Sequence, residues 1–235
     1  MTEAGFDARV RSAMHPAVEA GTYKWVDFDR QSITRRYDRL AHIIPLFDWL
    51  FFQPPGFRAK AVARLNLKPG DRVLEIGCGT GRNLTHLRKA VGAEGCVIGV
   101  DLSRGMLSKA GALCRRNKWN NVELVEGDAG EFTAPEPFDG VMFGLSYNTI
   151  PHHLAVLHRG WSQLRPGGRL VIMDARVPPG IGGQLVLPFG LWLMKNTMLG
   201  NPLVQPWEDL KQVAGTCDME EFVFGSWYIC GATKP

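Results

Sequence analysis

The chain lacks the features that mark disulfide-rich, zinc-binding or nucleic-acid-binding proteins. Its cysteines are odd in number and no two have C-x-x-C spacing, so we read them as reduced thiols of a cytosolic protein: Cys78, Cys96, Cys114, Cys217 and Cys230. No cluster of His, Cys or carboxylates has metal-ligand spacing, and we predict no metal. The net charge of +4 is mild and no Lys/Arg run reaches five residues, which argues against a nucleic-acid partner.

Long hydrophobic runs are also missing. The N-terminus carries Glu3 and Asp7 and has no apolar core, so we expect no signal peptide. The segment Val177–Met194 has no charge, but prolines and glycines interrupt it, and a membrane span needs about 20 apolar residues. Its aromatic and aliphatic content fits a lid over an apolar acceptor, with Phe189 and Trp192 as contacts. It also fits a helix at a membrane surface, or a helix packed on a sheet.

The composition is that of an ordinary globular domain, with 45% hydrophobic and 21% charged residues among 235. Hydrophobic spacing predicts a helix from near Arg30, which Pro45 should kink or divide. We therefore divide the chain into an N-terminal arm and helical cover, residues 1–66, and a core domain, residues 67–235.

The core begins with the stretch V-L-E-I-G-C-G-T-G, Val73 to Gly81. A short apolar strand runs into three alternate glycines, and a helical pattern follows from Arg82 to Val91, ending at Gly92. Strand, glycine turn and helix form the first half of a nucleotide-binding βαβ unit. The sixth position is arginine and no Gly-Lys-Ser/Thr is present, which excludes the dinucleotide fingerprint and the P-loop.

This stretch resembles motif I of the class I S-adenosylmethionine-dependent methyltransferases. Three companions match the family in order: Asp101 with Leu102–Leu107, which is similar to D-x-S-x-x-M-L, then Glu126–Ala129, then Arg165–Gly168. The resemblance covers about residues 67–175. It implies an α/β, Rossmann-like fold with a seven-stranded, mostly parallel sheet, helices on both faces and an N-terminal helical cover. The implied cofactor is S-adenosyl-L-methionine.

The resemblance and the position of the glycine turn together assign the cofactor contacts. These are Tyr37, Glu75, Gly77, Cys78, Gly79, Thr80, Gly81, Asn83, Asp101, Leu102, Met106, Asp128, Ala129, Gly144 and Leu145. Asp101 should accept both ribose hydroxyls, although an acid at a helix N-terminus would look the same. Glu75 either supports the loop and the cofactor's amino-acid end or has a purely structural partner. Tyr37 either covers the cofactor or only packs its helix.

The stretch Ser146–His153 follows the fourth predicted strand, Asp139–Leu145, and is rich in polar side chains. Ligands of open α/β sheets bind beyond the carboxyl ends of the strands. We therefore name Tyr147, His152 and His153 as catalytic candidates, with Tyr147 better suited to contact the substrate than to abstract a proton. The alternative is that the histidines are ordinary residues near a helix start.

We predict methyl transfer to a small acceptor with an apolar body. The Tyr37-Asp38 segment and the uncharged segment are similar to those of quinone C-methyltransferases and bacterial phospholipid N-methyltransferases. Two other functions stay open: transfer of another group from the same cofactor, and cofactor binding without transfer. The expected partners are the small acceptor and a peripheral membrane surface. The sequence leaves the acceptor atom and the oligomeric state open.

Overall fold

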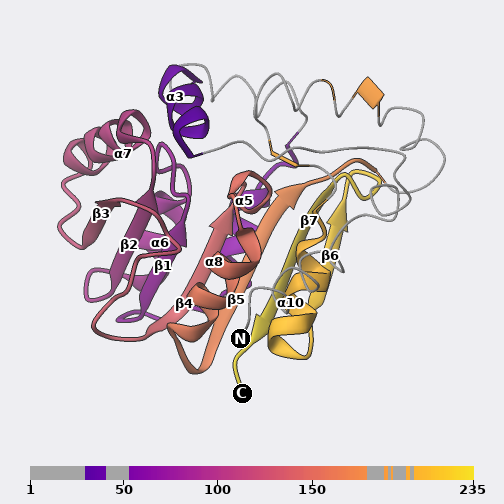
Figure 1. The fold of residues 1–235 in the computed structure, drawn as a ribbon. Helices are drawn as coiled ribbons and strands as arrows, with labels where there is room; N and C mark the ends of the chain where they lie inside the picture. Colours follow the sequence, from indigo (N-terminus) through magenta and orange to yellow (C-terminus); the bar gives the residue numbers. More distant parts are fainter. Residues whose placement is uncertain (1–29, 41–52, 179–187, 190–191, 193–199, 202–203) are drawn as a thin grey trace.

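The computed structural model describes residues 30–40, 53–178, 188–189, 192, 200–201 and 204–235 (Figure 1). Its centre is a seven-stranded sheet in the order β3-β2-β1-β4-β5-β7-β6. The first five strands in the chain are parallel: β1 (Arg72–Ile76), β2 (Cys96–Asp101), β3 (Val122–Glu126), β4 (Phe138–Gly144) and β5 (Leu164–Ala175). The antiparallel hairpin β6 (Asp218–Phe222) and β7 (Trp227–Thr233) completes the sheet. The predicted fold class is confirmed.

Helices cover both faces of this sheet. On one face lie α5 (Phe57–Ala63), α6 (Leu84–Val91) and α7 (Arg104–Arg116), and their apolar side chains form one core with Val73 and Val97. On the other face lie the 3-10 helix η1 (Tyr147–Thr149), α8 (His153–Ser162) and α10 (Pro206–Ala214), which pack against Leu74 and Ile76. The central strand β1 is buried from Val73 to Ile76 because helices cover both of its faces.

The strand β5 begins at Leu164, which pairs with Phe138, so the strand includes the family motif Arg165–Gly168. The pairing shifts register before Gly140. Proline has no N–H for the ladder, so an irregular start around Pro166 follows from its chemistry.

A single carboxylate fastens α3 (Arg30–Leu40) to the start of α7. Oδ1 of Asp38 accepts hydrogen bonds from Oγ of Ser103 at 2.5 Å and from the N–H of Gly105 at 3.0 Å. Ser103 itself caps α7 by accepting the N–H of Met106 at 3.1 Å. Helix N-termini favour negative charge, which explains the attachment. The helix α3 therefore lies over the upper edge of the sheet in Figure 1, and the expected kink at Pro45 is outside the described residues.

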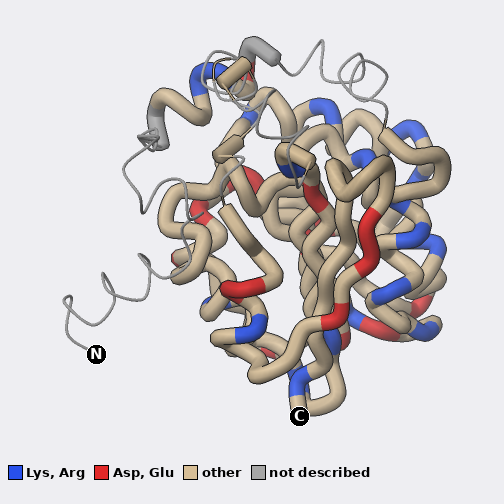
Figure 2. Tube along the Cα trace, turned by 90° about the vertical axis from the view of Figure 1, so that its right-hand side faces the viewer, with Lys and Arg blue, Asp and Glu red and all other residues tan. Residues whose placement is uncertain are grey.

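The edge strand β6 is acidic and is paired with basic residues of its neighbours (Figure 2). Arg64 binds both Asp218 and Glu220, and Arg176 binds Glu221. Charged side chains on an edge strand oppose pairing with another sheet. These ion pairs also hold the end of α5 against the hairpin and fix the direction of Arg176.

Candidate functional site

A cavity of about 360 Å³ follows the carboxyl edge of the sheet, which is a size typical of small-molecule sites. Its wall takes residues from the ends of β3, β2, β1, β4 and β5 and from the start of β7, and Ile33, Thr34 and Tyr37 of α3 close one side. The cavity thus crosses nearly the whole width of the sheet. This is the edge at which open α/β sheets bind ligands.

The glycine loop brings the backbone directly to this cavity. Gly77 has φ 70° and Gly79 has φ 55°, a region that side-chain-bearing residues rarely adopt. A Cβ on Gly77 would lie 2.4 Å from Cβ of Ser146, so only glycine fits there. A Cβ on Gly79 would have no described atom within 4 Å, which leaves the space beside its backbone open to a ligand.

The carboxylate of Asp101 is held by two backbone amides. Its Oδ2 accepts the N–H of Gly79 and its Oδ1 accepts the N–H of Ser103, both at 2.8 Å. Burial raises the pKa of Asp101, and these two amide hydrogen bonds oppose that rise. Asp101 therefore joins β2, the glycine loop and the start of α7, and it lines the cavity in a fixed orientation.

Behind the loop lies a buried polar chain. Nη1 of Arg58 donates to Oδ1 of Asn83 at 2.8 Å, and Nδ2 of Asn83 donates to Oε1 of Glu75 at 2.6 Å. Burial raises the pKa of Glu75 to about 8, and its Oε2 has no partner among the described residues. Arg58 and Asn83 line the cavity, whereas Glu75 does not. The sequence contained no spacing signal for Arg58, because α5 reaches the site only through the fold.

All predicted cofactor residues except Glu75 and Gly81 line the cavity. These are Tyr37, Gly77, Cys78, Gly79, Thr80, Asn83, Asp101, Leu102, Met106, Asp128, Ala129, Gly144 and Leu145. Gly81 instead allows close packing, since a Cβ there would lie 2.8 Å from Cδ1 of Leu84. Leu145 has φ 61°, a costly conformation for a leucine and one that its sequence does not signal.

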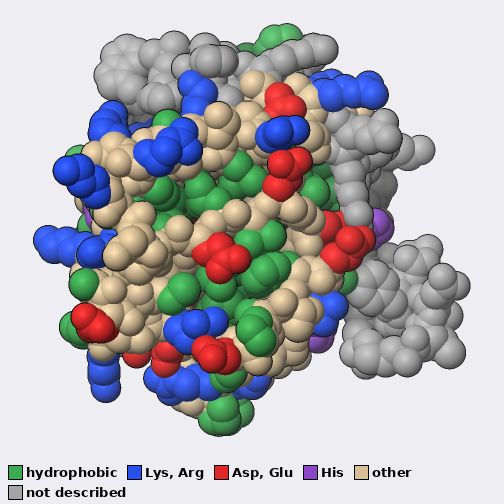
Figure 3. Space-filling model, turned by 90° about the vertical axis from the view of Figure 1, so that its left-hand side faces the viewer, with side chains coloured by type: hydrophobic (Ala, Val, Ile, Leu, Met, Phe, Trp, Pro, Cys, Tyr) green, Lys and Arg blue, Asp and Glu red, His purple; other side chains and the backbone are tan. Residues whose placement is uncertain are grey.

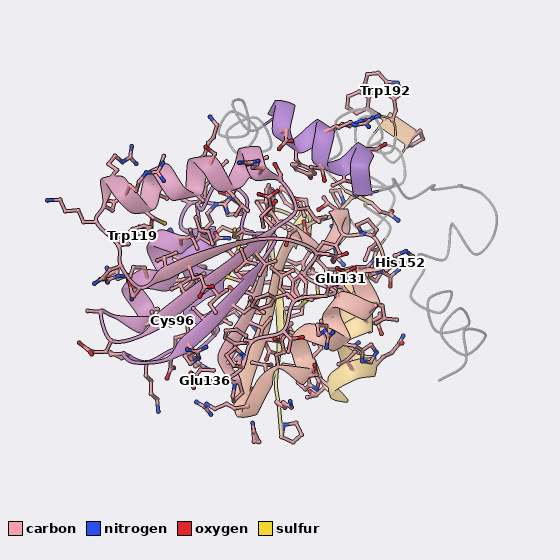
Figure 4. All side chains as sticks on the ribbon, turned by 60° about the vertical axis from the view of Figure 1, so that its left-hand side comes forward. Cys96, Trp119, Glu131, Glu136, His152 and Trp192 are labelled. Carbon is pink, nitrogen blue, oxygen red and sulfur yellow. The ribbon has the colours of Figure 1, made fainter. Side chains whose placement is uncertain are left out.

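The three catalytic candidates lie away from the described cavity, and a catalytic role for them stays a prediction. Tyr147 is fully buried, and its hydroxyl donates to Oδ2 of Asp209 of α10 at 2.9 Å. Nε2 of His153 lies 3.6 Å from the same oxygen, and His152 is exposed at the start of α8 (Figure 4). None of the three lines the cavity. The reason is local: η1 and a left-handed His152 (φ 54°) turn these side chains away from the sheet edge.

Other residues form the wall beyond β4. Thr149, Ile150 and Pro151 line it from the η1 side, and Asp174 and Arg176 line it from the end of β5. Asp174 lies at the carboxyl end of β5 much as Asp101 lies at the carboxyl end of β2. That parallel is the signal for Asp174 that the sequence contains.

The uncharged segment lies mostly outside the described residues. Of its two named aromatic residues, Phe189 is 64% exposed and Trp192 is 60% exposed (Figure 4). Their rings are stacked, with the ring centroids 5.9 Å apart. Neither belongs to the described cavity wall. A role for this segment at the acceptor therefore stays a prediction.

Within the described ranges, no group of three or more His, Cys, Asp or Glu side chains could hold a metal ion. No helix of the same ranges is long and apolar enough to cross a membrane. On the face beside β3 and α7, acidic and basic side chains are mixed around hydrophobic ones (Figure 3). The distribution of charged side chains therefore marks no binding surface on that face.

Comparison with known families is decisive for the class. The model described as Protein-L-isoaspartate(D-aspartate) O-methyltransferase (PCMT) matches residues 50–175, which are 126 of the 235 residues. The chain belongs to this family of S-adenosylmethionine-dependent methyltransferases. The matched range contains the glycine loop and Asp101 and ends at the last residue of β5. The predicted class I resemblance is confirmed.

Curated relatives carry a different acceptor in their names. The chain is 33% identical over 153 residues to a demethylmenaquinone methyltransferase of Oceanobacillus iheyensis, covering 65% of this chain and 62% of that protein. It is 36% identical over 150 residues to the demethylmenaquinone methyltransferase of Staphylococcus saprophyticus, covering 63% and 61%. The chain thus spans only about three fifths of these relatives' lengths.

Solved structures agree on the fold. Phosphoethanolamine N-methyltransferase 2 of Haemonchus contortus, in complex with S-adenosyl-L-methionine, superposes with a TM-score of 0.70 at 18% identity, covering 88% of this chain and 60% of that one. At this identity the likeness concerns the fold alone. The family's cofactor is S-adenosylmethionine, and the fixed carboxylate of Asp101 and the open backbone of Gly79 fit a ribose and an adjoining chain.

Proposed function

We propose that this protein transfers the methyl group of S-adenosylmethionine to a small, quinone-like acceptor with an apolar body. The observation that carries the proposal is the extent of the cavity. It begins beside β3, passes the glycine loop and continues past β4 to Asp174 and Trp227. A cofactor placed over the glycine loop and Asp101 leaves the end at β5 and β7 for a second molecule.

The cofactor end is assigned from the side chains that face it. Asp101 binds the ribose hydroxyls, Asp128 and Ala129 flank the adenine, and the amides of Gly77–Thr80 approach the amino-acid part. Arg58 and Asn83 lie near enough to the loop to bind the carboxylate of that part, with Glu75 supporting Asn83 from behind. Tyr37 and its neighbours on α3 lie over the cofactor and exclude water.

When bound, the cofactor supplies a methyl group on a positively charged sulfur, which leaves as a neutral thioether. The protein's task is then to position the acceptor in line with that methyl and to keep water out. The residues of the acceptor end suit an apolar body, because Ile150, Pro151 and Trp227 all line the cavity.

The names of related proteins point to three acceptors: a protein isoaspartate, a demethylated quinone and phosphoethanolamine. The relatives named for the quinone share 33% and 36% identity, whereas the structure named for phosphoethanolamine shares 18%. The isoaspartate family model ends at residue 175, before Arg176 and Trp227 of the acceptor wall. These facts together favour the quinone.

Transfer of tritiated methyl from S-adenosylmethionine tests the proposal. The acceptors to compare are a membrane lipid extract containing demethylmenaquinone, an isoaspartyl peptide and phosphoethanolamine. We expect label in the quinone fraction of the extract. Label in the peptide or in phosphoethanolamine alone would contradict the acceptor. Tight binding of S-adenosylhomocysteine with no labelled product would instead favour a cofactor-binding protein.

A peripheral membrane contact follows from an apolar acceptor that resides in the bilayer, and it is part of the proposal, as is a cytoplasmic location. Phe224 is 95% exposed at the turn between β6 and β7, next to Val223. The same turn continues into Ser226 and Trp227, which line the cavity. We expect the protein to float with phosphatidylglycerol vesicles and Phe224→Ser to float less, because an exposed aromatic ring favours the membrane interface. Equal recovery of both in the vesicle layer would refute this contact.

A further inference from the structure

Asp174 occupies the part of the cavity that the cofactor assignments leave. It lies at the carboxyl end of β5, is only 5% exposed and lines the cavity. The strands that carry the assigned cofactor residues are β3, β2, β1 and β4, and β5 is the next strand in the sheet. Strands lie about 4.8 Å apart, so Asp174 lies one strand beyond β4, on the side away from the adenine. It therefore lies at the end of the cavity that the proposed function leaves for the acceptor.

The carboxylate is held in place without being saturated. Its Oδ1 accepts the N–H of Ala175 at 2.9 Å, and its Oδ2 accepts the N–H of Asn148 at 3.3 Å. Nδ2 of Asn148 also donates to the carbonyl of Ala175 at 3.0 Å, which closes the arrangement. A carboxylate has about four acceptor positions, so these two amides leave room for a donor from a ligand.

The surroundings of Asp174 tune it for proton transfer. Burial raises the pKa of Asp174 to about 7, so that its carboxylate and carboxyl forms are both populated at neutral pH. The titratable groups around it are Tyr37 of α3 and Tyr228 and Cys230 of β7, with the charged Arg176 two residues along. Burial raises the pKa values of both tyrosines and of the cysteine, farther from neutrality. Of Asp174, the two tyrosines and the cysteine, Asp174 is the group whose raised pKa lies near neutrality.

We propose that Asp174 binds and deprotonates a hydroxyl group carried by an aromatic acceptor ring. The inference rests on the proposed function and specifies its acceptor as the reduced, hydroquinone form of a quinone, a hydroxylated ring that is methylated on carbon. The hydroxyl proton passes to Asp174, and the electron pair stays on the acceptor oxygen and enriches the neighbouring ring carbon. That carbon takes the methyl group, while the pair of the broken carbon–sulfur bond remains with sulfur. The hydrogen on that carbon leaves as a proton to water, and Asp174 returns its proton to the oxygen.

Binding to protein saturated with S-adenosylhomocysteine tests this assignment without turnover. The probes are 1-naphthol and 1-methoxynaphthalene, which differ by one methyl group on the oxygen, and calorimetry gives their dissociation constants. We expect wild type to bind 1-naphthol at least tenfold more tightly, because a hydrogen bond to a charged group contributes roughly one to two factors of ten. The preference should increase from pH 5.5 to pH 8.5 as Asp174 ionises. No preference, or none that depends on pH, would overturn the proposal.

The variant Asp174→Asn keeps the shape and removes the charge. It should lose the preference for 1-naphthol while binding 1-methoxynaphthalene and S-adenosylhomocysteine as wild type does. The control is Asp209→Asn, because burial also raises the pKa of Asp209 to about 7 but Asp209 does not line the cavity. Asp209→Asn should keep the preference. If Asp174→Asn fails to fold, the pH dependence in wild type still decides. Tighter binding of 1-(aminomethyl)naphthalene than of 1-naphthol would exclude a hydroxyl as the donor.

Kinetics separates this inference from the proposed function. The carboxylate form is the active one, so kcat/KM for the labelled acceptor should rise with pH through about 7 in wild type and in Asp209→Asn. The rise should vanish in Asp174→Asn, with kcat at least tenfold lower. Methyl transfer with an unchanged pH profile in Asp174→Asn would refute the role of Asp174 and leave the function intact. A probe preference without any methyl transfer would refute the function and leave the binding role intact.

Discussion

The N–H of Gly79 donates a 2.8 Å hydrogen bond to Oδ2 of Asp101, 22 residues later in the chain. The bond joins the glycine loop after β1 to the end of β2. The other oxygen of Asp101 is held by Ser103 at the start of α7. Asp101 therefore has the structural role of an acid at a helix N-terminus, and the proposed ribose contact is made in addition to it.

Substituting Asp101 tests both roles. Asp101→Ala should lower the affinity for S-adenosylhomocysteine at least tenfold, because two charge-assisted hydrogen bonds are lost at roughly 1.5–3 kcal/mol each. Asp101→Asn should be intermediate, since one oxygen remains as an acceptor. Calorimetric titration measures both. An unchanged dissociation constant in Asp101→Ala would leave Asp101 with the structural role alone.

Asp38 should control how firmly α3 closes the cavity. Asp38→Ala removes the acceptor for Ser103 and Gly105 and should cost about 0.5–2 kcal/mol, as loss of a helix cap does. We expect a lower melting temperature and weaker S-adenosylhomocysteine binding, because α3 carries Tyr37. Asp38→Asn keeps an oxygen acceptor and should restore most of both. Cofactor affinity equal to wild type in Asp38→Ala would show that α3 does not contribute to cofactor binding.

Tyr147→Phe separates packing from catalysis. The ring would stay in the core against Phe143, while Asp209 would lose the hydroxyl that donates to it. Leaving a buried acceptor without its donor costs roughly 1–3 kcal/mol, so the melting temperature should fall. We expect kcat of the folded enzyme to stay within twofold of wild type. A loss of kcat with an unchanged melting temperature would instead support a catalytic role for Tyr147.

Stability should decrease as pH rises across the neutral range. Burial raises the pKa of Glu75 to about 8 and those of Asp174 and Asp209 to about 7, so the folded chain keeps protons that the unfolded chain has already lost. Their contribution is full below about pH 4 and is lost as pH rises through 7 to 8. Scanning calorimetry should give a higher melting temperature at pH 5.5 than at pH 8.5. In Asp209→Asn the difference in melting temperature between the two pH values should be smaller. An unchanged difference would contradict the raised pKa of Asp209.

The sequence predicted the strands best where a short apolar run stands between turn signals. The strand expected before the glycine turn is β1, Arg72–Ile76, and the helix expected to end at Gly92 is α6, Leu84–Val91. Such features are local, because period and capping chemistry are written in neighbouring residues. The family resemblance predicted most of the residues that line the cofactor end of the cavity.

The acceptor end could not be predicted in the same way. Tyr147 follows the end of β4 and Asp174 lies at the end of β5, yet one side chain turns into the core and the other into the cavity. The difference depends on the path of the chain through η1 and on the position of α10, which contacts Tyr147 from 62 residues away. Arg58 reaches the site from α5 for the same reason. The direction in which a side chain points after a strand depends on contacts that form only in the complete fold.

Arg176 connects the turn at Phe224 to the cavity wall. Its backbone N–H donates to the carbonyl of Ser226, and its Nε donates to the carbonyl of Gly225, both at 2.8 Å. Its guanidinium also lies over the ring of Trp207 at 4.6 Å. If the turn binds lipid as proposed, a shift of the turn would be passed to Arg176 through these two hydrogen bonds. The lipid contact and the acceptor end of the cavity would then be coupled through one side chain.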